Sequence, residues 1–119
     1  MTICEVIKQC EQTGAWFGIE IKDLNQTNDM DDTPLHTVCS WGVLEPVKLL
    51  IENGANVNAV GNLGCTPLFN AIIGENIEVV EFMLKAGADK DIKNSLGRTP
   101  LQYACNVSAP KKIIDILKD

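Results

Sequence analysis

Thr33-Pro34-Leu35-His36 is the stretch that decides the fold, because its first three residues return twice at one spacing. Thr66-Pro67-Leu68 and Thr99-Pro100-Leu101 repeat them, and the interval between the first and second copies equals that between the second and third. The pair Gly54-Ala55 follows the same period and recurs as Gly87-Ala88. A fixed period of 33 residues, from Thr33 to Thr66 to Thr99, with the same residues at the start and end of each unit, predicts a stack of helical repeats.

Each unit carries the local signals of two helices. Its threonine is suited to cap a helix N-terminus, and the proline that follows suits the first helical position, where its missing N–H does no harm. The second helices are expected to start near Glu45, Glu78 and Pro110. Gly54 and Gly87 are expected to end the first two of them, because glycine readily adopts a positive φ.

The pattern resembles the ankyrin repeat over residues 28–119. The resemblance implies an all-α ankyrin solenoid of paired antiparallel helices with hairpin loops, about four repeats in one domain. The expected units are a degenerate N-terminal capping repeat and three full repeats, at residues 1–27, 28–60, 61–93 and 94–119.

The two ends of the chain depart from the repeat pattern. Ile3, Val6, Ile7 and Cys10 recur at three- and four-residue steps, which predicts an amphipathic helix before Thr13-Gly14. We expect Trp16 and Phe17, which follow it, to pack inward on the first full repeat. In the last helix, Asp115 replaces an apolar residue, so we expect a polar end and a finished array.

The net charge of −6 is unevenly distributed. Residues 1–32 hold two lysines against seven acids, and residues 33–84 hold one lysine against five acids. Residues 85–119 hold seven basic residues against four acids. The excess of acids in the N-terminal part of the chain argues against nucleic acid as a partner. No apolar run approaches the length of a membrane-spanning helix.

The sequence offers little for catalysis or metal binding. The five cysteines form no Cys-x-x-Cys pair, and His36 is the only histidine. This pattern favours free thiols in a reducing compartment, so we expect a cytoplasmic protein. Cys39 and Cys105 are interpreted as small buried groups, and the resemblance implies that His36 hydrogen-bonds within and between repeats. We therefore expect no enzyme activity, no metal and no cofactor.

In the family, partners are held by the hairpin tips and by the exposed side of each first helix, which together form a concave face. The resemblance places candidate partner-binding residues at the matching positions of the three full repeats. They are Asp29, Met30, Asp32, Ser40, Trp41, Asn62, Leu63, Cys65, Ile73, Gly74, Ser95, Leu96, Arg98, Asn106 and Val107.

Two features of that set exceed what folding requires. Met30, Leu63 and Leu96 are each one repeat period apart and predict an apolar row along the hairpin tips, with packing on adjacent hairpins as the alternative. Trp41 is interpreted as an exposed binding anchor, with partial burial as the alternative.

A second hypothesis concerns the acids of the first hairpin. Asp29, Asp31 and Asp32 crowd this hairpin, and Asp31 replaces the glycine of the later ones. With Glu20 or Asp23, they are predicted to meet a basic patch on a partner and to speed its association.

The sequence therefore predicts a non-catalytic protein–protein interaction module. Its sharper form is a small acidic inhibitor or immunity-type protein that masks a basic patch on another protein. The alternatives are an adaptor that bridges two proteins and, from a different class, a redox sensor or enzyme acting through Cys65 as the most exposed thiol. A monomer is favoured, with neither nucleic acid nor a membrane as partner.

Overall fold

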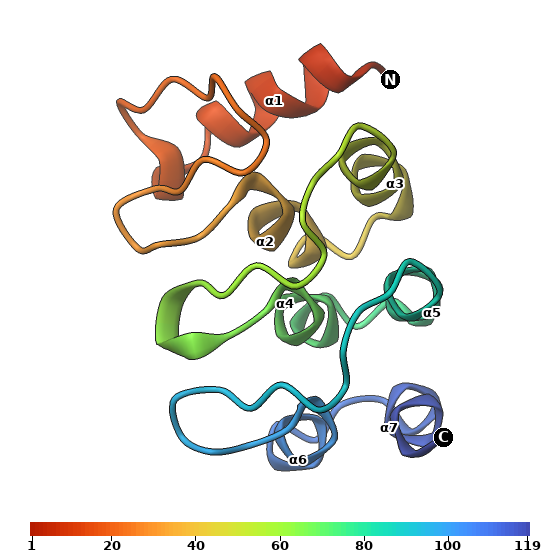
Figure 1. Cartoon of the computed structure of the whole chain (residues 1–119). Coiled ribbons are helices and arrows are strands. Elements are labelled where there is room, and N and C mark those ends of the chain that lie inside the picture. The colour runs from red at the N-terminus through yellow and green to blue at the C-terminus, as the bar shows by residue number, and fades with distance from the viewer.

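The computed structural model describes all 119 residues and contains helices and loops but no strand. The all-α solenoid predicted from the sequence is confirmed. Figure 1 shows α2, α4 and α6 stacked in one row and α3, α5 and α7 in a second row, with the long loops projecting beside the first row. In chain order the helices are α1 (Ile3–Glu11), η1 (Gly14–Trp16), α2 (Pro34–Cys39), α3 (Leu44–Glu52), η2 (Asn62–Gly64), α4 (Pro67–Gly74), α5 (Ile77–Lys85), α6 (Pro100–Asn106) and α7 (Lys111–Lys118).

One continuous core connects the repeats. Helices of the first row contact one another in the order α2, α4, α6, and those of the second row in the order α3, α5, α7. Leu35 and Leu68, from the first two Thr-Pro-Leu units, are completely buried, whereas Leu101 at the end of the stack is half-buried. A repeat at the end of a stack has a neighbour on one side only, so its inner face is covered less completely.

Each threonine of the Thr-Pro-Leu units is the N-cap of a first-row helix, as predicted. The hydrogen bonds of the threonine hydroxyl groups differ between the helices. At α6 the Gln102 N–H donates to Thr99 Oγ1 and the Thr99 N–H donates to Gln102 Oε1, at 3.3 and 2.9 Å. This reciprocal pair is a capping box. At α4 the third helical residue is Phe69, which has no side-chain acceptor, and the buried Thr66 Oγ1 has no hydrogen-bond partner.

The helix ends and second-row starts also agree with the sequence. Gly54 and Gly87 have φ values of +103° and +104° just beyond α3 and α5. The second-row helices begin at Leu44, Ile77 and Lys111, each one residue from the predicted start.

Asparagines tie neighbouring repeats together on the loop side. Asn25 Oδ1 accepts the Asn56 N–H at 2.8 Å, and Asn58 Oδ1 accepts the Asp89 N–H at 2.9 Å. Asn25 and Asn58 are one repeat period apart, so the same contact is made at two successive interfaces. These bonds fix each loop relative to the next repeat.

The N-terminal segment covers the first full repeat with one helix. Figure 1 shows α1 lying across the stack, whereas α2 to α7 are viewed end-on. It packs against both α2 and α3, with Val6 and Cys10 completely buried. The amphipathic helix is confirmed, while the assignment of residues 1–27 to a degenerate repeat stays a prediction.

The prediction for the aromatic pair after α1 is half right. Trp16 is completely buried, and its Nε1–H donates to Thr37 Oγ1 at 2.9 Å. Phe17 is 87 % exposed, so its inward packing was wrongly predicted. The chain turns at Gly18, which has a φ of +77°, and a turn immediately after Trp16 leaves the next side chain directed to solvent.

Two further burial predictions are wrong. Cys39 is buried, with its Sγ 3.8 Å from Met83 Sδ in the next repeat, but Cys105 is exposed because no further repeat covers the same face of α6. Trp41 is half-buried and packs against the core, so the alternative of partial burial holds. Asp115 is exposed on α7.

Candidate functional site

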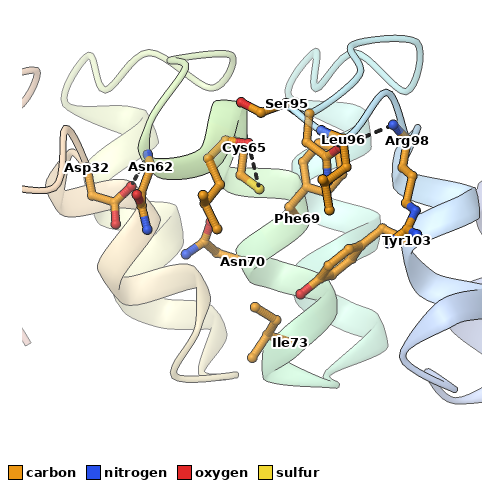
Figure 2. Close-up of a pocket in the computed structure, with 12 residues that line it drawn as sticks. Asp32, Asn62, Cys65, Phe69, Asn70, Ile73, Ser95, Leu96, Arg98 and Tyr103 are labelled. Carbon is orange, nitrogen blue, oxygen red and sulfur yellow. Dashed lines mark hydrogen bonds between the residues drawn. The ribbon is translucent and has the colours of Figure 1, made fainter.

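A groove of about 290 Å³ runs beside the second and third hairpins (residues 61–65 and 94–98; the first is residues 28–32) and over α4 and α6 (Figure 2). It lies on the side of the stack from which the loops project. Its lining combines apolar side chains with one acid, one base and several amides. The lining residues are Asp32, Asn62, Leu63, Cys65, Phe69, Asn70, Ile73, Asn94, Ser95, Leu96, Arg98 and Tyr103.

Two aromatic rings form the floor of the groove. Phe69 on α4 and Tyr103 on α6 meet edge to face, with ring centroids 5.5 Å apart and planes at 72°. This is a favourable arrangement for aromatic pairs. Phe69 is almost completely buried beneath the groove, whereas Tyr103 is half-buried. Burial, followed by the effect of the neighbouring Cys65, raises the pKa of Tyr103, so its phenol is neutral near pH 7.

Leucines at the hairpin tips form the rim. Leu63 is 69 % exposed and Leu96 is 73 % exposed. The two hairpins are joined by the Ser95 N–H, which donates to the Leu63 carbonyl at 2.9 Å. Met30 at the first tip is exposed too, but it does not line the groove. The predicted apolar row is therefore exposed, and its two later members lie at the groove.

Leu63 adopts a conformation that leucine rarely takes. Its φ of +57° and ψ of +25° place it in the left-handed region, which costs a residue with a Cβ about 1–2 kcal/mol. Strain of this kind gathers at functional sites. The exposed, strained Leu63 side chain is the feature of this groove that folding alone explains least.

A missing side chain at Gly61 makes room for the second hairpin. Asn28 and Asn94 hold the equivalent position in the neighbouring repeats, and their Oδ1 atoms accept N–H groups two and four residues later. At Gly61 a Cβ would lie 2.7 Å from His36 Nε2 and would also collide with the Asp32 carboxylate. Asp32 Oδ1 instead accepts the N–H that follows Gly61, at 2.9 Å.

His36 supports this hairpin from below, as the resemblance implied. Its Nδ1 accepts the Thr33 N–H at 3.0 Å, which leaves the proton on Nε2 to donate to the Cys65 carbonyl at 3.0 Å. The ring is completely buried. Burial lowers the pKa of His36 below its usual value of 6.5, more than the hydrogen bond to Cys65 and the charge of Asp32 raise it.

This shift predicts a loss of stability on acidification. The unfolded chain binds a proton at His36 below about pH 6.5, while the folded chain resists it until a lower pH. Stability from this group is therefore full above pH 6.5 and falls as the pH drops toward the folded pKa, by at most about 1.4 kcal/mol per pH unit. Urea denaturation between pH 7.5 and 5 should show a smaller decrease for His36→Gln than for the wild type. Equal decreases would contradict the assignment.

Cys65 does not have the properties of a reactive thiol. It is half-buried, while Cys4 and Cys105 are the exposed cysteines, so its choice as the most exposed thiol was wrong. Burial and then the Asp32 charge raise the pKa of Cys65, and the weaker effect of Asn94 opposes them. A sensor thiol requires the opposite shift, because the thiolate is the reactive form.

Alkylation kinetics should follow burial. With iodoacetamide at pH 7.5, we expect Cys4 and Cys105 to react first and Cys65 at least several-fold more slowly. Cys10 and Cys39 should react only after unfolding, because burial raises the pKa of both, to about 12 for Cys10. Mass spectrometry of peptides at timed intervals measures each rate. Faster modification of Cys65 than of Cys4 would revive the redox-sensor alternative.

Eight of the fifteen candidate partner-binding residues line the groove. Of the rest, Asp29 and Met30 lie exposed on the first hairpin, and Asn106 lies exposed at the end of α6. Ser40 is half-buried, and its hydroxyl donates to the Thr37 carbonyl at 2.7 Å. These residues and Trp41 lie outside the groove, and their binding role stays a prediction.

Four lining residues were missed: Phe69, Asn70, Asn94 and Tyr103. A signal existed for the first, because Phe69 takes the place of His36 in the repeat register and so has no capping role. Asn70 and Tyr103 share the next register position. Nothing in the sequence marks that position as facing the groove rather than the core.

Stacked helix pairs with a groove along the loop side define a solenoid of the class that presents an extended concave binding surface. The family described as "Ankyrin repeats (3 copies)" matches residues 6–94 and 62–119. The chain belongs to the ankyrin-repeat family. Ankyrin repeats are generally protein–protein interaction modules and are typically non-catalytic.

A search of curated proteins found no match to this chain. None of its helices combines the length and the apolar character needed to cross a membrane.

Proposed function

We propose that this protein binds a partner protein in the groove between its second and third repeats, without catalysing a reaction. The observation that carries the proposal is Leu63, an exposed leucine held at a positive φ on the groove rim. An exposed apolar side chain gains free energy when a partner covers it, and burial of a leucine contributes about 1.5–3 kcal/mol. That gain is as large as, or larger than, the conformational cost of about 1–2 kcal/mol that Leu63 imposes on the free protein.

The acidic first hairpin supports the finer proposal that the partner carries a basic patch. Asp29 and Asp31 are exposed next to Asp32, which lines one end of the groove. Clustered surface charge of one sign raises association rates with an oppositely charged partner. A small acidic inhibitor that masks a basic surface fits this arrangement. The basic residues of 85–119 favour, as a second candidate, an adaptor with two differently charged ends.

The variant Leu63→Gly tests the groove directly. We expect it to be more stable than the wild type by about 0.5–1 kcal/mol, because glycine relieves the left-handed strain at some entropic cost. We also expect it to bind the partner about ten-fold or more weakly. The partner is first isolated from host lysate on the immobilised wild-type chain. Calorimetry on the purified pair then gives both affinities, and urea denaturation gives both stabilities.

Val60→Ala is the matched control. Val60 is an exposed aliphatic residue in the same loop, but it does not line the groove. The control should therefore leave the affinity unchanged. Equal affinities for the wild type and Leu63→Gly would place the binding surface elsewhere. Salt-independent association would contradict the basic-patch proposal alone.

A further inference from the structure

The groove carries opposite charges at its two ends. Asp32, Cys65 and Arg98 all immediately precede a Thr-Pro pair, so they occupy one position in three successive repeats. Figure 2 shows Asp32 at one end of the groove and Arg98 at the other, with Cys65 and Phe69 between them. Successive repeats thus present a carboxylate, a neutral thiol and a guanidinium in a row.

Neither end charge is neutralised within the chain. Asp32 Oδ1 accepts one backbone N–H, but its Oδ2 has no hydrogen-bond partner. The Arg98 guanidinium is exposed and makes neither an ion pair nor a hydrogen bond. The two ion pairs of the molecule join the N-terminal ammonium group to Glu45 of α3 and Lys118 to Asp115 within α7, and neither involves a residue that lines the groove. Both charges are therefore available to a ligand.

The surface between the charges is apolar. The Leu63, Ile73 and Leu96 side chains are 69 %, 54 % and 73 % exposed around the aromatic floor. A volume of about 290 Å³ is at the lower end of what holds a small ligand. It therefore suits one large aliphatic side chain with its flanking backbone, rather than a folded domain.

The spacing of the charges suits an extended chain. Packed helices lie about 8–10 Å apart, so residues two repeats apart are separated by roughly 20 Å. An extended peptide rises about 3.3 Å per residue, so about six residues cover this distance. A compact small molecule would not reach both charges at once.

Resting on the proposed function, we propose that the groove binds an extended segment of the partner with three anchoring side chains. A lysine or arginine pairs with Asp32, and an aliphatic side chain lies over Phe69 and Tyr103. An aspartate or glutamate about six residues from the base pairs with Arg98. The segment can run in either direction, because the groove fixes the places of the side chains and not the polarity of the backbone.

Selection from a random twelve-residue peptide library, on the immobilised full chain, tests this inference. We expect enriched peptides to carry opposite charges about six residues apart with an aliphatic residue between them. Asp32→Asn should abolish the preference for the base only, and Arg98→Gln the preference for the acid only. Each substitution should lower the affinity of a selected peptide about two- to five-fold, as expected for exposed ion pairs.

Two controls separate direct contacts from the general charge of the protein. Asp91→Asn removes an exposed acid outside the groove, and Lys93→Gln removes an exposed base near the third hairpin. Both should leave the enriched pattern unchanged. Asparagine at position 32 keeps an acceptor for the hairpin N–H, and circular dichroism checks that every variant is folded.

The remaining outcomes overturn the inference in distinguishable ways. The selected peptides could depend on Leu63 but show no charge pattern, or show a charge pattern that is insensitive to Asp32→Asn and Arg98→Gln. Either result would refute the charged-segment proposal and leave groove binding intact. If no enriched peptide depends on Leu63, the groove does not bind extended segments. Calorimetry of Leu63→Gly with the isolated partner then decides separately whether the groove binds a folded surface.

Discussion

The Gly74→Ala variant is expected to lose about 3 kcal/mol of its free energy of unfolding, because the added methyl group meets rigid backbone. A Cβ at this position would lie 2.6 Å from the Cys39 carbonyl oxygen and 2.9 Å from the Gly42 nitrogen. The same turn is held from the other side by Asn76, whose Nδ2–H donates to the Gly42 carbonyl at 2.9 Å. Neither neighbour can move without separating the first and second repeats.

Gly14→Ala provides the control for this prediction. Gly14 has no atom within 4 Å of an added Cβ and no positive φ, so its substitution should change stability by less than about 0.5 kcal/mol. Urea denaturation of both variants, with the slope of the transition compared, measures the difference. A loss at Gly74 no larger than at Gly14 would show that the two turns are not in close contact.

This role of Gly74 was not visible in the sequence, although its position was. Repeat register places Gly74 with Trp41 and Val107, and the resemblance made all three candidates for partner contact. Trp41 is half-buried, Val107 is exposed, and Gly74 is small because another backbone occupies the space of its side chain. Register assigns a position on the repeat but not the contents of the space around it.

The helices were predictable because their signals are local. A Thr-Pro pair, a glycine with positive φ and an apolar stripe each act within one turn of helix, so a recurring pattern places all six helices of the full repeats. Phe17 shows the opposite case. It lies outside the period, and whether it or Trp16 faces inward depends on a turn at Gly18 that no repeat specifies.

The groove was only partly predictable for the same reason. Its rim follows from the hairpin register, which located Leu63, Leu96 and Arg98 correctly. Its floor depends on Phe69 and Tyr103 meeting across two repeats, a contact between residues far apart in the sequence. Such a pair is specific to this chain, and a family pattern does not encode it.

The second large effect is expected at His36, whose ring links the first repeat to the second hairpin. Replacing it by alanine removes a completely buried ring, leaves the Thr33 N–H without its acceptor and deletes the bond to the Cys65 carbonyl. Cavity formation and one unsatisfied buried donor together predict a loss of about 4 kcal/mol. The Cys65 carbonyl retains the Gly61 N–H at 2.8 Å, which limits the loss.

Replacing His36 by glutamine separates the two contributions of His36, which are the cap of α2 and the hydrogen bond to Cys65 in the second hairpin. Gln102 already caps α6 by accepting the Thr99 N–H at 2.9 Å, so glutamine at position 36 is expected to keep the cap of α2 and lose only the bond to the next repeat. Its loss should be about 1–2 kcal/mol, the value of one buried hydrogen bond. Denaturation of the two variants gives both numbers. If glutamine destabilised the protein as much as alanine, the bond to Cys65 rather than the cap would be the main contribution of His36, and the second hairpin would depend on it for its position over the groove.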